Sequence, residues 1–102
     1  MIIKLNVGGT RYEVARSLIE MYPNTMLARM VSNEWQDDPR KDIVVERDGD
    51  RFKYVLDYLR DGKVHVPISI CKESLHGDLQ YFGIAWCDKY IYHMVKTNSV
   101  SL

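Results

Sequence analysis

The sequence predicts an α+β domain with a small three-stranded sheet and about five helices. Apolar and polar residues alternate on both sides of a glycine pair near the start, as in half-buried strands joined by a turn. Farther along, apolar residues recur at helical spacing. Strands and helices do not alternate as they would in a parallel α/β sheet, so the α+β class fits better.

The first 15 residues predict a β-hairpin. Ile3, Leu5 and Val7 alternate with polar residues, and Tyr12 and Val14 do so after the glycine pair. Two adjacent glycines permit the positive φ angles of a tight turn. The pair lacks the lysine of a P-loop and the third glycine of a dinucleotide fingerprint, so a phosphate-binding loop is excluded.

Two short helices and a third strand are expected next. Ser17 caps the first helix, over 17–22, and Asn24 or Thr25 caps the second, over 25–32. A polar loop over 33–42 then leads to a strand over 43–45.

The loop contains Trp35, for which two interpretations stay open. The ring either folds back over the small core or anchors a partner chain, because tryptophan often dominates interface energetics.

The clearest helix lies between Asp48, its predicted N-cap, and Gly62, where it ends. Its apolar residues fall at i, i+3, i+4 and i+7, which gives one buried face. These residues are Phe52, Val55, Leu56 and Leu59.

The C-terminal part predicts one weak strand and two helices. Residues 63–69 contain Pro67 and are expected to form an edge strand at most. A helix that carries Leu75 and Leu79 follows, and residues 87–96 are expected to form a last amphipathic helix.

Three motifs in order give the sequence a family resemblance. They are NVGG at 6–9, PNTML at 23–27 and ERDGDRFKYVLDYLRDG at 46–62, followed by LQYFGI. Together they resemble the BTB/POZ fold, and more narrowly its potassium-channel tetramerization branch, over nearly all of residues 2–85. On this basis the domain spans 1–96, with a frayed tail at 97–102.

The resemblance implies a homo-oligomerisation module that forms a ring of four or five copies through polar faces. Some members form the cytoplasmic assembly domain of voltage-gated potassium channels. Others are soluble scaffolds, and several of those recruit a cullin ubiquitin ligase. We expect a cytoplasmic adaptor of the soluble kind, with the channel domain as the alternative.

Composition excludes several other classes. The chain carries 14 basic and 14 acidic residues, without the basic run that nucleic-acid binding requires. The apolar runs are too short to cross a bilayer. Nothing places a base or an oxyanion hole beside either cysteine, so neither an enzyme nor a cofactor is expected.

The resemblance also implies that charged residues near the hairpin and the clearest helix face a neighbouring subunit. Ring contacts are heterologous, so a basic residue on one face meets an acidic residue on another. The predicted interface residues are Arg11, Glu13, Arg47, Asp48 and Arg60.

A zinc-locked ring is a further alternative that the resemblance implies. One group of channel tetramerization domains binds zinc between subunits through a His-x5-Cys pair and a later Cys-Cys. In this chain the matching positions leave His65, Cys71 and His93, because the other position is Tyr92. Cys87 replaces the missing ligand only if the last helix shifts. No metal is assigned on this basis.

Overall fold

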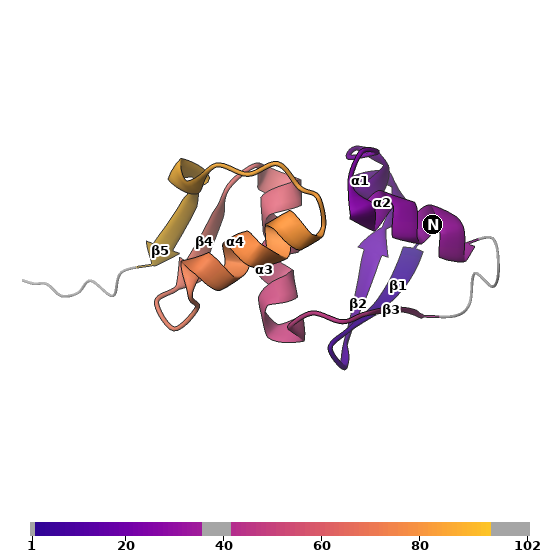
Figure 1. Cartoon of the computed structure of the whole chain (residues 1–102), viewed down its shortest axis with the longest axis horizontal. Coiled ribbons are helices and arrows are strands. Elements are labelled where there is room, and N and C mark those ends of the chain that lie inside the picture. The colour runs from indigo at the N-terminus through magenta and orange to yellow at the C-terminus, as the bar shows by residue number, and fades with distance from the viewer. Residues whose placement is uncertain (1, 36–41, 95–102) are drawn as a thin grey trace, which may run out of the picture.

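The computed structural model describes residues 2–35 and 42–94 (Figure 1). In chain order the elements are β1 (Ile2–Val7), β2 (Thr10–Ala15), α1 (Arg16–Glu20), α2 (Met26–Trp35), β3 (Ile43–Val45), α3 (Gly49–Asp61), β4 (Val64–Pro67), α4 (Lys72–Tyr81), the 3₁₀ turn η1 (Asp88–Tyr90) and β5 (Ile91–Met94).

The predicted hairpin and third strand form one sheet in the order β2-β1-β3. β1 is antiparallel to β2 and parallel to β3. Gly8 and Gly9 have φ angles of 56° and 94°, as the tight turn requires. The Gly8 amide also donates to the Val45 carbonyl at 3.0 Å, so the turn is tied to β3.

The elements divide into two halves that share one core. The three-stranded sheet with α1 and α2 forms one half, and α3, α4 and the β4–β5 sheet form the other (Figure 1). Buried residues from both halves belong to one continuous cluster, in which Leu5, Phe52 and Leu79 are each at most 1% exposed.

Helix α3 confirms the strongest helix prediction. The Asp48 side chain accepts a hydrogen bond from the Arg51 amide at 3.1 Å, which satisfies one free amide of the first turn. Gly62 ends the helix. The predicted apolar face, from Phe52 to Leu59, is buried.

The N-cap of α1 and the C-terminal end of α2 differ from the prediction, whereas the N-cap of α2 agrees with it. Helix α1 begins at Arg16 after Ala15, which makes no side-chain cap, so the Ser17 cap is wrong. Thr25 does cap α2, because its hydroxyl accepts from the Ala28 amide at 3.1 Å. Helix α2 continues to Trp35, since neither glycine nor proline interrupts 33–35. The Trp35 ring lies outside the described side chains.

The predicted last helix is wrong over the residues that the structure describes. Residues 88–90 form η1, and Ile91–Met94 form β5, which pairs in parallel with β4. β4 offers a strand partner and buries Ile91, and this tertiary contact overrides the helical pattern. The described residues therefore contain four α-helices rather than five. The predicted tail lies outside them.

Candidate oligomerisation interface

The outer face of the three-stranded sheet carries polar side chains. Strand alternation turns Leu5 and Val7 into the core and leaves Lys4 on the opposite face. In the register of the hairpin, Lys4 lies opposite Glu13 and Asn6 lies opposite Arg11. Two predicted interface residues, Arg11 and Glu13, therefore share this face, which we call the outer sheet face.

Charged residues line a shallow depression of about 310 Å³ on this face. The side chain of Arg11 is 80% exposed and its Nε lies 3.2 Å from an oxygen of Asp42. Lys4 and Glu13 line the same depression. Glu13 has no ion-pair partner among the described residues.

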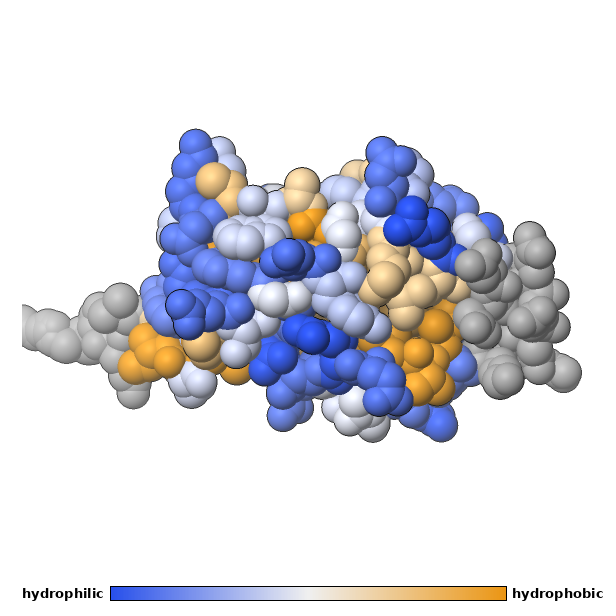
Figure 2. Space-filling model, in the orientation of Figure 1, coloured by the Kyte–Doolittle hydropathy of each residue, from blue (hydrophilic) through white to orange (hydrophobic). Residues whose placement is uncertain are grey.

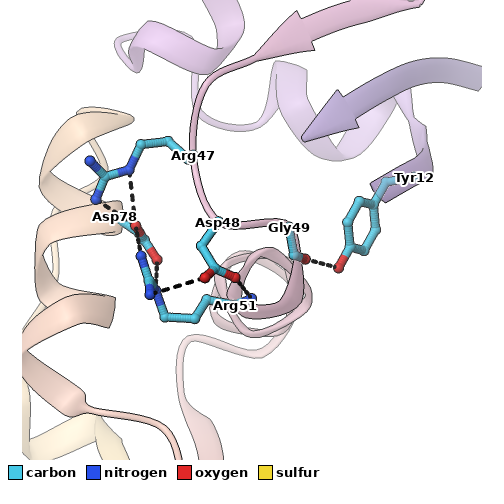
Figure 3. Close-up of polar contacts among 6 residues, drawn as sticks. All are labelled: Tyr12, Arg47, Asp48, Gly49, Arg51 and Asp78. Atoms are coloured by element: carbon cyan, nitrogen blue, oxygen red, sulfur yellow. Dashed lines mark hydrogen bonds and ion pairs between the residues drawn. The ribbon is translucent and has the colours of Figure 1, made fainter. Parts of the chain in front are cut away.

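A buried ion cluster holds Arg47 within its own chain (Figure 3). Asp78 of α4 is 1% exposed, and its carboxylate accepts from Arg47 Nε at 3.0 Å and from Arg51 Nε at 2.6 Å. The hydrogen bond to Asp78 raises the pKa of Arg51. The Arg47 guanidinium also lies 4.9 Å from the centroid of the Tyr81 ring. These contacts give Arg47 a structural role within the chain.

The sequence reasoning missed Asp78, although one signal was present. Asp78 directly precedes Leu79 on the side of α4 that also buries Leu75. An acidic residue at a buried position of a helix requires a cationic partner. Its partners stand 27 and 31 residues earlier in the chain, so sequence spacing does not identify them.

The other two predicted residues lie on α3. Asp48 caps the helix, and its carboxylate also lies 3.4 Å from the Arg51 guanidinium. The Arg60 side chain, in the last turn, is 48% exposed, and its one ion pair within the described part of the chain is a 3.8 Å contact with Asp57. Arg60 is therefore held loosely, whereas Asp48 already satisfies the helix terminus.

Hydrophilic residues dominate the side of the molecule that Figure 2 draws. Figure 2 shows blue hydrophilic residues over most of this face of the molecule, with smaller orange patches toward its two ends. None of the helices within the described residues is both long enough and apolar enough to cross a membrane.

The three residues considered for zinc are not brought together within one chain. His65 stacks on Tyr92 with ring centroids 4.9 Å apart, and His93 Nε2 lies 2.8 Å from the Ile70 carbonyl. Cys71 is exposed at the start of α4. Among the described residues, no group of three His, Cys, Asp or Glu side chains is arranged to hold a metal.

Comparison with known proteins gives a consistent family. A model of the BTB/POZ domain matches residues 3–89. The potassium voltage-gated channel protein Shal of Drosophila melanogaster is 38% identical over 80 residues, which are 78% of this chain and 14% of that protein. The BTB/POZ domain-containing protein KCTD18 of Bos taurus is 39% identical over 88 residues, 83% of this chain and 21% of that protein.

A third relative is the A-type voltage-gated potassium channel KCND3 of Homo sapiens, 32% identical over 83 residues, 81% of this chain and 13% of that protein. The chain thus spans about a fifth or less of the length of these relatives. The family model covers most of the chain, and both channels and a KCTD protein align with it. The chain therefore belongs to the BTB/POZ family, in its potassium-channel tetramerisation branch.

Proposed function

We propose that this chain assembles copies of itself into a closed ring of four or five. The match of residues 3–89 to the BTB/POZ model carries the proposal, because domains of this type self-associate. The balance of 14 basic and 14 acidic residues supports it, since a near-zero net charge does little to keep copies apart. The polar outer sheet face offers complementary charges for such a contact.

Glu13 and Arg60 are the strongest interface residues of the five predicted. The other three already have partners within the chain. Arg47 pairs with Asp78, Asp48 caps α3, and Arg11 pairs with Asp42. Glu13 has no partner among the described ion pairs, and the contact of Arg60 is long at 3.8 Å. A ring contact joins two different faces, so we assign Glu13 of one copy to Arg60 of the next.

The ring acts as a cytoplasmic adaptor, for which a cullin ubiquitin ligase is one partner. The second candidate is the assembly domain of a voltage-gated potassium channel. Similarity to KCTD18 at 39% and to Shal at 38% supports both roles almost equally. Adding the purified N-terminal domain of a cullin separates them, because a rise in mass supports the adaptor and an unchanged mass favours the channel.

Light scattering coupled to size exclusion tests the ring itself. A mass of four or five chains, with and without a chelator, is the expected result. A mass that falls only with chelator would support a zinc-locked ring instead. A monomer at high concentration would overturn the proposed function.

A charge swap tests the interface separately from the ring. E13K and R60E each place like charges together and are expected to lower the mass toward a monomer. The double variant E13K/R60E restores the opposite pair and is expected to restore the ring. K89E, in η1, makes an equal charge change elsewhere and leaves the ring intact. Failure of the double variant to reassemble contradicts this pairing but not the ring.

Variants of Arg47 and Asp48 are less useful for this purpose. Removing Arg47 withdraws a partner from buried Asp78, and removing Asp48 uncaps α3. Both changes weaken folding and assembly together, so a lower mass would not show which was affected.

A further inference from the structure

The described part of the chain has four edge strands, each with one side that pairs with no other described strand. They are β2 and β3 in the larger sheet and β4 and β5 in the smaller one. An unpaired edge presents backbone amides and carbonyls that readily bond to a strand of another chain. Proteins protect such edges with charged residues, proline or very short strands. An unprotected edge therefore indicates a place where chains join.

Three of the four edges carry such a protection. β2 contains Arg11 and Glu13, β3 has 3 residues between Asp42 and Glu46, and β4 ends on Pro67, which has no amide hydrogen. β5, with the sequence IYHM, contains no Asp, Glu, Lys, Arg, Pro or Gly. β5 is therefore the one edge strand of the described residues without a charge or a proline in or beside it on the side of η1 that it joins.

Contacts within the chain hold β5 in place. The Ile91 side chain is 2% exposed and packs in the core. The Tyr92 ring stacks on His65 of β4 with centroids 4.9 Å apart, and His93 Nε2 lies 2.8 Å from the Ile70 carbonyl. β5 also lies at the end of the molecule away from the three-stranded sheet (Figure 1). The strand is thus preorganised and accessible, which lowers the entropic cost of pairing.

The solvent-facing side of the smaller sheet is apolar beside this edge. Val64 and Val66 face the core, so the alternate residues of the register, His65 opposite Tyr92 and Pro67 opposite Met94, face outward. The exposed fractions of Tyr92 and Met94 are 41% and 48%, and that of Ile68, which follows β4, is 62%. A strand added to β5 would cover Tyr92 and Met94 while its backbone bonds to the free edge.

Charge favours a second copy of this chain as the added strand. A two-fold contact places each residue of the strand near the same residues of the other copy, so a charged edge repels itself. The edge Ile91–Met94 has no acidic residue, lysine or arginine and avoids this penalty. Tyr92 and Met94 point to one side, so an axis normal to the sheet sets Tyr92 opposite Tyr92 or Met94 of the second copy. Both are apolar cross-strand pairs that stabilise a sheet.

We propose that β5 pairs antiparallel with β5 of a second copy, so that two smaller sheets become one four-stranded sheet across two chains. The contact is separate from that of the proposed ring, which joins two different faces. Each strand has 4 residues, so the pairing is weak and forms at high protein concentration. At low concentration the ring is expected alone, and at high concentration β5 joins one ring to another.

Sedimentation equilibrium of the whole chain over increasing protein concentration tests the pairing. The average mass is expected to rise at least about twofold, because a two-fold contact joins copies in pairs. Y92E and Y92K each place like charges across the axis and are expected to abolish the rise. An equimolar mixture of the two variants places opposite charges there and is expected to restore it. M21K changes a 68% exposed apolar residue at the end of α1 and keeps the rise.

Each variant is compared with itself at low concentration, so the result does not depend on whether the low-concentration species is a ring. M94E replaces Y92E if that variant does not fold by circular dichroism. A constant mass for the unchanged chain, or an equal rise in Y92E, would overturn the pairing.

Hydrogen–deuterium exchange separates strand pairing from a contact of side chains alone. Amides of 91–94 are expected to exchange more slowly at high concentration in the unchanged chain, and at the same rate at both concentrations in Y92E. Association without this protection counts against a shared sheet.

Discussion

Asp78 ties the link after β3 and helix α3 to helix α4 through a single carboxylate. It is 1% exposed and binds Arg47, from the link after β3, and Arg51, from α3 (Figure 3). The arginine side chains are 29% and 22% exposed, so water still reaches them in part. The cluster therefore contributes to stability mainly because removing one member leaves a charged group of the others without its partner.

Replacing Asp78 with alanine tests that cost. D78A leaves two partly buried cations unpaired, and we expect the free energy of unfolding to fall by roughly 3 kcal/mol. Urea denaturation followed by circular dichroism measures it, at one protein concentration because assembly adds to apparent stability. D57A removes an exposed pair whose charges lie 3.8 Å apart, and we expect less than about 0.5 kcal/mol. Equal losses in the two variants would contradict the role of burial.

Cys71 gives a prediction of pH dependence at one thiol. The polar groups of the first turn of α4, those of Ser74 first and then the Glu73 amide, favour the thiolate and lower the pKa of the Cys71 thiol. A lower pKa means more thiolate near neutral pH, so the pH profile of alkylation is expected to shift downward relative to an unstructured cysteine peptide. Mass spectrometry of a C87S variant follows Cys71 alone. A profile that coincides with the peptide's would refute this.

The two glycines inside helices differ in what surrounds them. A Cβ on Gly49, at the start of α3, would lie 2.2 Å from the Val7 carbonyl and 2.5 Å from the Thr10 hydroxyl. The N-terminus of α3 thus packs directly on the hairpin. The Tyr12 hydroxyl donates a hydrogen bond to the Gly49 carbonyl at this contact. A Cβ on Gly77, in α4, would meet only the Arg47 guanidinium at 3.5 Å.

Alanine at these two positions is expected to have opposite effects. G49A forces α3 away from the hairpin and is expected to destabilise the chain by about 1–3 kcal/mol. G77A fits without a shift and is expected to stabilise it by about 0.5–1 kcal/mol, because alanine is the better helix former. Thermal unfolding of both variants measures the difference. A stabilised G49A would show that α3 approaches the hairpin less closely than described.

Elements with strong local patterns were predictable from the sequence. The hairpin, α3 and the Thr25 cap follow from alternation, helical spacing and capping chemistry over a few residues. β5 was not predictable in this way, because its strand partner lies 27 residues earlier. A short apolar and aromatic run such as 91–94 fits a strand or a helix until a partner is known.

The candidate interface residues, which stay a prediction, could be chosen from the sequence only as a set of charges. Sequence alone placed Arg11 and Glu13 beside one another on the hairpin, and the register confirms that both lie on the outer sheet face. It could not separate Arg47, held by Asp78, from Arg60, held loosely. That distinction depends on contacts between distant segments, which no local spacing encodes.

At the scale of the whole molecule, domains of this family are non-catalytic oligomerisation modules, which confirms the prediction that this is not an enzyme.

The proposed assembly is expected to depend on salt. Exposed charges at the proposed contact are screened over about 3 Å in 1 M salt. Light scattering at low protein concentration is therefore expected to show a smaller mass in 1 M sodium chloride. A mass that rises with salt would indicate an apolar contact instead.

The cluster around Asp78 has a consequence for how sequences of this kind diverge. One acidic residue serves two arginines in different segments, so losing it leaves two positive charges behind, and losing one arginine still leaves a neutral pair. We expect positions 47, 51 and 78 to co-vary among homologues, with the acidic position the slowest to change. Where position 78 becomes apolar, at least one of the two arginines is expected to have been replaced earlier in that lineage.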